Sequence, residues 1–371
     1  MTAPSDNIPE QETGGVLTID LAAIVGNWRD LAARTGSAEC AAVVKADGYG
    51  CGLVRVAHAL AVAGCRTFFA AHLEEARQAR NAAPDATIYV LNGLMPGTGQ
   101  AHARDDLRPV LCSPEELSEW SAFRAATGWN GGAALHIDTG INRLGFDAAH
   151  AATMSSPTGI TLLMSHFGFS DNPAHPLNAV QMGRFRAIRE RFPETPASLA
   201  NSSGIFLGPD AHHDMVRPGA ALYGVNPTPG HSNPMQPVVQ LQGRVLQVRD
   251  VAAGDTVGYA AVWTARRASR VAIVAIGYAD GFPRAAGSSD LHAGADAMVA
   301  GRRCPLAGRV SMDVLAVDVT DAPEGQPVRG DLVSFLDNDM TVDEVAGHSG
   351  TIGYEVLTRL GRRYRRVYRA A

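Results

Sequence analysis

The sequence lacks the patterns that mark a disulfide-bonded, zinc-binding or membrane-spanning protein. Its five cysteines are odd in number and none stands in CxxC spacing, which argues against a disulfide framework and a zinc site. No apolar run approaches the length that crosses a bilayer. The first fifteen residues are polar and have neither the basic start nor the apolar stretch of a signal peptide. We therefore expect reduced thiols, a flexible tail over residues 1–15 and a cytoplasmic protein without a membrane partner.

An excess of positive charge is also missing. The formal net charge is -5, so neither nucleic acid nor an anionic membrane surface is expected as a partner. The hydrophobic fraction of 46% and the charged fraction of 19% are those of an ordinary globular protein. A chain of 371 residues is longer than one hydrophobic core usually serves, so we expect two domains.

Short apolar runs alternate with helix-like segments from residue 17 to about 225. A helix-like stretch at 19–34 comes first, and Ser113 followed by Pro114 and Glu116 is a typical helix start. Apolar strands separated by helices indicate a parallel sheet that is covered on both faces. Eight runs fit a TIM (β/α)8 barrel, and an open doubly wound sheet is the alternative. The runs lie at 40–45, 67–72, 87–92, 107–112, 133–138, 161–167, 197–201 and 214–219.

A linker and a change of pattern divide the chain. Four prolines stand among polar residues at 226–237. Beyond them the segments are strand-like, with little helical periodicity until 341–347. We therefore expect an α/β protein with a TIM-barrel domain over 16–237 and a mostly β C-terminal domain over 238–371.

The glycines after the first run are spaced GxGxG, so the dinucleotide fingerprint GxGxxG is not met.

Polar residues stand where the predicted barrel strands end, which is where barrels carry their chemistry. Lys45 ends the first run and Arg217 ends the eighth. Hydroxyl and backbone N–H groups follow runs seven and eight, where barrels often bind a phosphate. A lysine, a phosphate site and an arginine at one barrel mouth indicate pyridoxal phosphate held as a Schiff base. The remaining members of the set are Asp138, Arg143, His166, Asn201, Ser202, Ser203, Gly204, Gly219 and Ala220.

Each of these residues also has a purely structural explanation. A lysine at a strand end more often reaches into solvent, and a lone histidine is more often a hydrogen-bonded structural residue. Arg217 could form a plain ion pair, and Ser202 could cap a helix. The pair His212–His213 stands near Asp214, but nothing else in the sequence supports a metal. The combination, and no single member, indicates the cofactor.

The sequence resembles the alanine racemase family along nearly its whole length. The segment AVVKADGYGCG around Lys45 is similar to the pyridoxal-phosphate lysine motif of that family. Further blocks follow in the family's order: DTGINRLGF, SHF, ANSSG, VRPGAALYG, GYADGFPR, GRVSMDVLAVDV and GTIGYEVLTRL. The resemblance implies a TIM barrel followed by a β domain. It also implies an enzyme that interconverts L-alanine and D-alanine and supplies D-alanine for peptidoglycan.

The resemblance assigns roles to individual residues. Lys45 would hold pyridoxal phosphate and act as one catalytic base, and Tyr259 of the partner subunit would be the second base. The chain would therefore form a homodimer whose active sites are shared across the interface. The cofactor would contact Tyr49, His166, Asn201, Ser202, Arg217, Gly219, Ala220 and Tyr354, and the substrate would contact Arg143, Tyr278, Met312 and Asp313.

These residue types suit racemisation. The α-proton must leave one face and return on the other, so one base on each side of the cofactor is what the reaction needs. Lys45 must be neutral to act, and a cation such as Arg143 would lower its pKa. Arg217 can only donate, which would leave the pyridine nitrogen unprotonated and would suppress transamination. We expect His166 to bond Arg217 and to relay its positive field to Tyr259.

The sequence departs from the family pattern in three places. His136 stands two residues before Asp138, where the family commonly has a lysine, often carboxylated, that would bond Arg143. Asp47–Gly48 and Cys51 differ from the usual residues beside the lysine, and Ser311 replaces a frequent cysteine. None of these changes removes a group that transfers a proton.

Other activities are possible on the same barrel. A broad-specificity or serine racemase of the family is the nearest alternative. A decarboxylase would need an acidic partner for the pyridine nitrogen, where Arg217 stands instead. A non-enzymatic pyridoxal-phosphate carrier would lack the domain beyond residue 237 and with it Tyr259.

Overall fold

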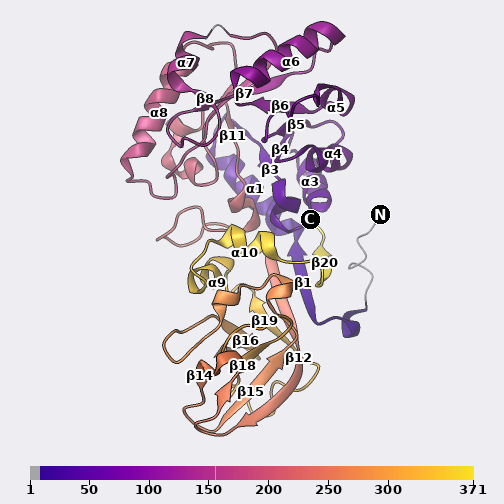
Figure 1. Ribbon diagram of the computed structural model, residues 1–371, viewed down its shortest axis with the longest axis vertical. Coiled ribbons are helices and arrows are strands. Elements are labelled where there is room, and N and C mark those ends of the chain that lie inside the picture. Colours follow the sequence, from indigo (N-terminus) through magenta and orange to yellow (C-terminus); the bar gives the residue numbers. More distant parts are fainter. Residues whose placement is uncertain (1–8, 155) are drawn as a thin grey trace. The chain divides into compact units, whose positions relative to one another are not determined.

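A computed structural model describes residues 9–154 and 156–371 (Figure 1). The chain divides into two compact units, one of Ile24–Gln236 and one that combines residues 9–23 with Pro237–Ala371. We call them the barrel unit and the β-rich unit. Residues 1–8 of the predicted tail lie outside the described residues, and Glu10–Glu12 form a short 3-10 helix, η2.

The barrel unit contains a strand in each of the eight predicted runs. The strands are β2 (Glu39–Cys40), β3 (Ala42–Val43), β4 (Thr67–Ala70), β5 (Thr87–Val90), β6 (Arg108–Leu111), β7 (Ala133–Asp138), β9 (Ile160–Met164), β10 (Ala197–Ser198) and β11 (Met215–Val216), with β8 (Phe146–Asp147) beside β7. They pair in parallel in the order β2-β11-β10-β9-β7-β6-β5-β4-β3. Because β2 and β3 are separated by one residue, the two ends of this path meet and the sheet closes. The predicted barrel is confirmed.

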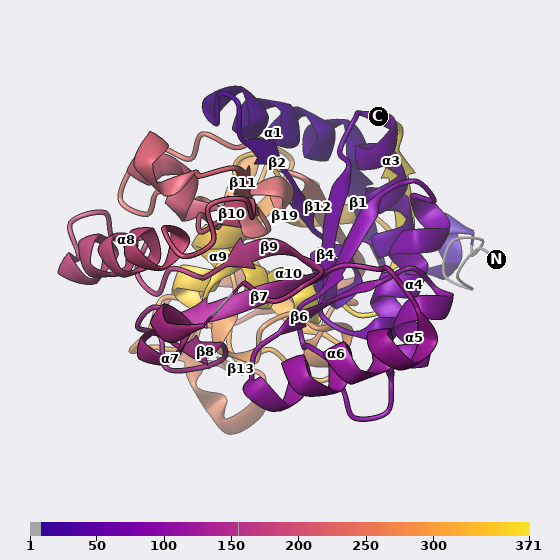
Figure 2. The ribbon, with the colours of Figure 1, turned by 90° about the horizontal axis from the view of Figure 1, so that it is seen from above.

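Helices connect the strands and lie around the outside of the barrel (Figure 2). Ser113 accepts the N–H of Glu116 at 3.3 Å and caps the helix that begins at Pro114, as the sequence predicts. The helices are α1 (Leu21–Arg34), α2 (Lys45–Tyr49), α3 (Leu53–Val62), α4 (Leu73–Ala82), α5 (Gly99–Arg104), α6 (Pro114–Thr127), α7 (Ala148–Thr153) and α8 (Pro176–Arg189).

Apolar side chains from all around the barrel fill its interior. Phe69 and Tyr89 stack with ring centroids 5.1 Å apart, and Tyr49 packs against this cluster from the end of α2. The buried members are Ala41, Val43, Phe69, Tyr89, Val110, Ala134, Leu162, Met164 and Met215. The interior is therefore a packed core and not a pore.

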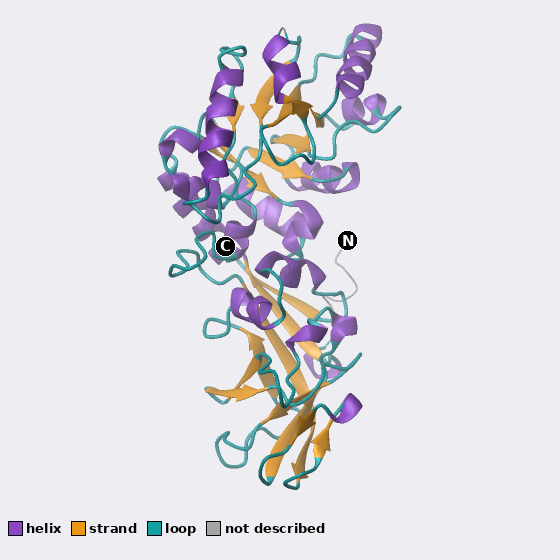
Figure 3. Ribbon diagram, turned by 60° about the vertical axis from the view of Figure 1, so that its left-hand side comes forward, coloured by secondary structure: helices purple, strands orange, loops and turns teal. Residues whose placement is uncertain are grey.

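The β-rich unit is built mainly from antiparallel strands, seen in orange in Figure 3. The long strand β12 (Val239–Val251) pairs with three others. The remaining elements are β13 (Thr256–Val257), β14 (Trp263–Thr264), β15 (Ser269–Val274), β16 (Asp296–Val299), β17 (Arg302–Pro305), β18 (Leu315–Asp318), β19 (Leu332–Leu336) and β20 (Arg365–Arg369), with helices α9 (Val342–His348) and α10 (Gly353–Arg359). A mostly β C-terminal part was expected and is confirmed.

One N-terminal segment differs from the expected division. Residues 15–20 form strand β1 (Gly15–Asp20), which pairs with β12 and β20 of the β-rich unit. The sequence pattern predicts that this segment belongs to the barrel and that a helix begins at residue 19. The helix begins at Leu21 instead, because Asp20 accepts the N–H of Ala23 at 2.8 Å. A six-residue strand carries no local sign of the sheet that it joins, so this pairing is decided by tertiary contacts.

Candidate active site

Lys45 begins helix α2 directly after barrel strand β3. Its side chain is half-buried. Burial and the positive charge of Arg143 lower the pKa of the amine, and the negative charge of Glu75 opposes them. Across residues 9–154 and 156–371, no hydrogen bond or ion pair engages this amine. An amine with a lowered pKa and no bonded partner is suited to act as a nucleophile or a base.

The residues that follow Lys45 form a left-handed turn. Values of φ are 54° at Ala46, 54° at Asp47, 62° at Gly48 and 52° at Tyr49. For residues other than glycine this conformation costs about 1–2 kcal/mol each. The carboxylate of Asp47 accepts the N–H of Leu53 at 2.9 Å and helps to hold the turn. Backbone strain beside a candidate catalytic lysine is typical of functional sites.

The segments after β10 and β11 form a small polar cradle. The Ser202 hydroxyl oxygen accepts the N–H of Gly219 at 3.0 Å and the N–H of Ala221 at 3.1 Å. Its own proton remains available to a ligand. A Cβ added at Gly219 would lie 2.4 Å from the Tyr49 hydroxyl, so that hydroxyl also reaches the cradle. The Tyr49 ring is held in place by stacking on Tyr223, with centroids 4.6 Å apart.

Two 3-10 helices begin at this cradle. η3 (Ser203–Leu207) follows β10, and η5 (Ala220–Tyr223) follows β11. N–H groups in the first turn of a helix have no partner within the helix and can bind an anion. Asn201 Oδ1 accepts the N–H of Gly204 at 2.9 Å and the hydroxyl of Ser170 at 2.8 Å, which orders the start of η3. The N–H groups of Ser203 and Ala220, which bond no other described residue, and the Ser202 hydroxyl together suit a phosphate group.

Arg217 follows β11 and has only 4% of its surface exposed. Its guanidinium donates to the Ser198 hydroxyl and, at 2.5 Å, to the carbonyl of Ser165. Burial lowers its pKa to about 9, and no carboxylate in the described part of the chain forms an ion pair with it. Its remaining N–H groups are available to a ligand. The expected bond to His166 is not among the hydrogen bonds of the described residues.

His166 follows β9, and a buried amide holds its backbone. Gln181 donates to the His166 carbonyl at 2.8 Å and to the Thr139 hydroxyl at 3.1 Å. Thr139 in turn bonds the Ser165 hydroxyl at 2.8 Å. Burial and then the charge of Arg217 place the pKa of His166 well below its usual range, so its ring is neutral. The sequence analysis missed Gln181, which carries no sequence signal because it lies on an outer helix.

Arg143 lies exposed in the turn after β7, where Asp138 orders the backbone. The Asp138 carboxylate accepts the N–H groups of Gly140 at 2.8 Å, Ile141 at 2.9 Å and Arg143 at 3.2 Å. His136 is buried in β7, and burial together with nearby arginines lowers its pKa to about 4. A neutral His136 cannot form an ion pair with Arg143. The hydrogen bonds of the Asp138 carboxylate therefore fix the backbone position of Arg143.

Three of the predicted substrate residues come together within the β-rich unit. The N–H of Tyr278 donates to the Ser311 carbonyl at 3.0 Å, and the N–H of Ala279 donates to the Met312 carbonyl at 2.9 Å. Asp313 pairs with Arg363 at 2.8 Å. The GYADG and SMD motifs, more than thirty residues apart in the sequence, are thus bonded to each other.

Two predicted tyrosines of the β-rich unit are exposed. Tyr259 begins the 3-10 helix η6 (Tyr259–Ala261) and is 72% exposed. Tyr354 lies in α10 and is 42% exposed. A largely exposed tyrosine at the tip of a turn is available to a partner chain or a ligand.

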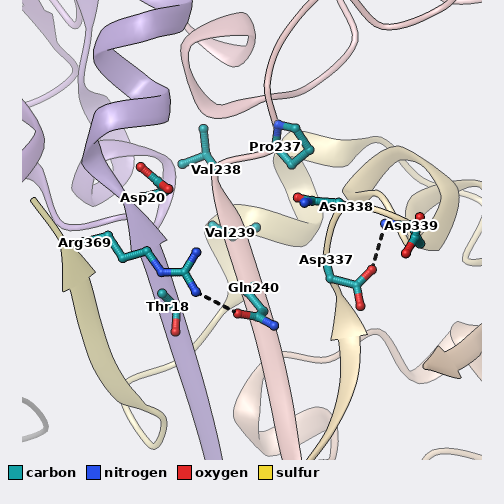
Figure 4. A pocket seen from close by; sticks show the side chains of 10 residues that line it. All are labelled: Thr18, Asp20, Pro237, Val238, Val239, Gln240, Asp337, Asn338, Asp339 and Arg369. Carbon is teal, nitrogen blue, oxygen red and sulfur yellow. Dashed lines mark hydrogen bonds between the residues drawn. The ribbon is translucent and has the colours of Figure 1, made fainter. Parts of the chain in front are cut away.

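The β-rich unit also has a pocket of about 330 Å³ that contains none of the predicted site residues (Figure 4). Its polar groups bond to one another: Arg369 donates to Gln240 at 3.4 Å, and Asp337 accepts the N–H of Asp339 at 2.9 Å.

Within the described residues, no three His, Cys, Asp or Glu side chains are grouped to hold a metal ion. Nor does any helix there have the length and apolarity to cross a membrane.

The composition also singles out Lys45. Lys45 is the sole lysine in the 371 residues, and the other 31 of the 32 basic side chains are arginine. Arginine supplies charge and hydrogen bonds, but it does not deprotonate or condense with a carbonyl group. The one position that keeps a lysine is the end of the first barrel strand, where amine chemistry was predicted.

The fold and the site define an α/β-barrel enzyme with a separate β-rich unit. Residues 19–227 match the family model for the alanine racemase N-terminal domain, and residues 238–368 match that for the alanine racemase C-terminal domain. The chain belongs to the alanine racemase family and is an isomerase that acts on amino acids.

Individual relatives cover the whole chain. An alanine racemase from Methylobacterium nodulans is 50% identical over 99% of this chain and 98% of its own length. One from Rhodospirillum rubrum is 45% identical over 97% of each chain. The crystal structure of alanine racemase from Bartonella henselae, with covalently bound pyridoxal phosphate, has a TM-score of 0.90 and 37% identity, covering 96% of this chain and 100% of that one.

Proposed function

We propose that this chain interconverts L-alanine and D-alanine with pyridoxal phosphate held by Lys45. The second base is Tyr259 of the partner subunit, and the product D-alanine serves peptidoglycan synthesis in the cytoplasm. The observation that carries the proposal is the sole lysine of the sequence, which has a lowered pKa and lies at the mouth of the barrel.

The barrel unit has groups that fit both ends of the cofactor. Ser202, Tyr49 and the N–H groups beside Gly219 suit the phosphate, and a side chain at Gly219 would fill part of that cradle. Arg217 suits the pyridine nitrogen, because its bonded partners are neutral oxygens and donors remain free. The segment after β11 that carries these groups neighbours the strand that precedes Lys45, since the N–H of Val43 in β3 donates to the Pro218 carbonyl at 2.9 Å.

When bound, pyridoxal phosphate supplies an electron sink for the carbon that loses its proton. Lys45 removes or returns the proton on one face, and Tyr259 of the partner subunit does so on the other. Arg143 lowers the proton affinity of Lys45, which favours the neutral amine that the reaction needs. Arg217 can donate and cannot accept, so it would hold a pyridine nitrogen that carries no proton, and the electron sink would then be a weak one.

The direct test follows the optical rotation of L-alanine with purified protein and pyridoxal phosphate. Decay to zero is expected, and Lys45→Ala should abolish it. Lys45→Arg is the matched control, because it keeps the charge and removes the amine chemistry. Persistent rotation with the wild-type protein would refute alanine as the substrate, and serine would be tried next.

Shared active sites have their own test. Lys45→Ala and Tyr259→Phe chains are each inactive, but a hybrid dimer retains one site with both bases. Mixing the two variants under conditions of subunit exchange should restore partial activity, up to about a quarter of the wild-type value for random exchange with one intact site in each hybrid. No recovery despite exchange, detected by mass-tagged subunits, would contradict sites built across an interface.

A further inference from the structure

One carboxylate bonds the backbone of the turn that carries Lys45. Glu75 stands in the first turn of α4, and its Oε1 accepts the N–H of Ala46 at 2.6 Å. Its Oε2 accepts the N–H of Ala71 at 2.8 Å and that of His72 at 3.3 Å. Ala46 follows β3, whereas the other two follow β4. A single side chain thus joins the ends of two neighbouring barrel strands.

The turn needs such an anchor. Ala46 has a φ of 54° and opens a run of left-handed residues that continues to Gly50. Side-chain-bearing residues keep this conformation only where their surroundings hold it. The bonded N–H belongs to the peptide group directly after Lys45. The anchor therefore acts one residue from the Cα that carries the amine, and it fixes the direction in which the side chain leaves the strand.

Glu75 also carries the negative charge that acts on the Lys45 amine. The groups that act electrostatically on Lys45 are Arg143 from the turn after β7, Glu75 from α4 and His166 from the end of β9. Burial and Arg143 lower the pKa of Lys45, Glu75 raises it, and His166 is neutral. Of these three groups, Glu75 alone favours the protonated amine.

We propose that Glu75 is a positioning residue for Lys45. Its carboxylate anchors the Ala46 peptide to the loop after β4, and its negative charge favours the protonated amine against the larger effects of burial and Arg143. The catalytic meaning of this inference rests on the proposed function, but the anchoring and the charge are properties of the chain itself.

The chain offers a matched control in Glu116. This residue takes the corresponding third position of α6, and its carboxylate accepts the N–H groups of Cys112, at 2.5 Å, and Leu94. It joins the segments after β5 and β6 as Glu75 joins those after β3 and β4. It is not among the groups that act on Lys45. Glu116→Gln removes a similar anchor and leaves the Lys45 turn untouched.

The first test measures the amine itself in the full-length protein freed of cofactor. Because Lys45 is the sole lysine, pulse acetylation with acetic anhydride across a pH series, followed by peptide mass spectrometry, reports this amine. Glu75→Gln should raise labelling at pH 8 roughly threefold or more, since losing the negative charge favours the neutral amine. Glu116→Gln should match the wild type. Equal labelling in Glu75→Gln and the wild type would overturn the role of the charge.

The second test separates anchoring from charge. Glu75→Asp keeps the charge but is one methylene shorter, so it cannot bond both loops. Amide hydrogen exchange over residues 45–50 should be about tenfold faster than in the wild type, and Glu116→Asp should leave it unchanged. Unchanged exchange in Glu75→Asp would overturn the anchoring. This variant also decides the matter if Glu75→Gln does not fold.

Racemase kinetics distinguish this inference from the proposed function. If the wild-type protein racemises alanine, Glu75→Gln should move the acid limb of its pH–kcat profile to lower pH, which a purely structural role would not do. An unmoved limb would count against the inference. If the wild-type protein does not racemise alanine, the proposed function fails, and the labelling and exchange results still decide the role of Glu75.

Discussion

Gly219→Ala is the substitution whose consequences the structure defines most closely. Gly219 has a φ of -126°, so the position does not need the positive φ for which glycine is favoured. Its Cβ would instead lie 2.4 Å from the Tyr49 hydroxyl oxygen, 3.1 Å from the ring carbon that bears it and 3.3 Å from Val43 Cβ. The clash is therefore with one atom, the hydroxyl.

The Tyr49 ring cannot move aside without loss. It stacks on Tyr223 at 4.6 Å, and the Tyr223 hydroxyl donates to the Val43 carbonyl at 3.1 Å. Crowding of a packed site costs about 1–3 kcal/mol. For a unit of this size, that lowers the melting temperature by about 3–9 °C. Displacing the Tyr49 hydroxyl and filling the cradle should also weaken pyridoxal-phosphate binding about tenfold or more, or at least 1.4 kcal/mol.

The assay is a double-mutant cycle with Tyr49→Phe, read by calorimetry of the cofactor-free proteins and by titration with pyridoxal phosphate. Tyr49→Phe removes the clashing atom, so the double variant should be about 1 kcal/mol more stable than the two single effects predict. Gly183→Ala is the control, because an added Cβ there, in α8, meets nothing within 4 Å. Additive effects, or a Gly219→Ala protein as stable as the wild type, would refute the steric argument.

Three further predictions follow from buried polar groups. Arg217→Glu should raise transaminase side activity, because a carboxylate keeps the pyridine nitrogen protonated; an unchanged ratio of transamination to racemisation would count against this. The same variant should unfold at lower temperature, since it loses the bonds to Ser198 and Ser165. His102 is buried with its pKa lowered to about 4, so between about 6.5 and 4 the unfolded chain binds more protons and stability falls as pH falls. His102→Phe keeps the ring beside Trp120 and should lose less stability between pH 7 and pH 4.5; equal losses by urea titration would contradict this.

Local sequence determined the barrel and the residue types at its mouth. Eight apolar runs between helical segments place a strand in each run, and Ser113–Pro114 starts α6 where predicted. Local patterns suffice here because burial on both faces leaves an apolar run, and capping needs only neighbouring residues. That Lys45, after β3, is the sole lysine can likewise be read from the sequence alone.

Tertiary structure alone decided which distant groups meet. Strand β1 pairs with β12 and β20, although the sequence of Gly15–Asp20 does not predict which strands it pairs with. The buried guanidinium of Arg217 bonds the Ser198 hydroxyl and the Ser165 carbonyl, and no hydrogen bond to His166 is among those of the described residues. The Glu75 anchor joins two loops through backbone N–H groups, which every residue except proline carries. A hydrogen bond to a backbone N–H does not depend on the side chain of the residue that donates it. The sequence therefore does not show such bonds, and only the folded chain does.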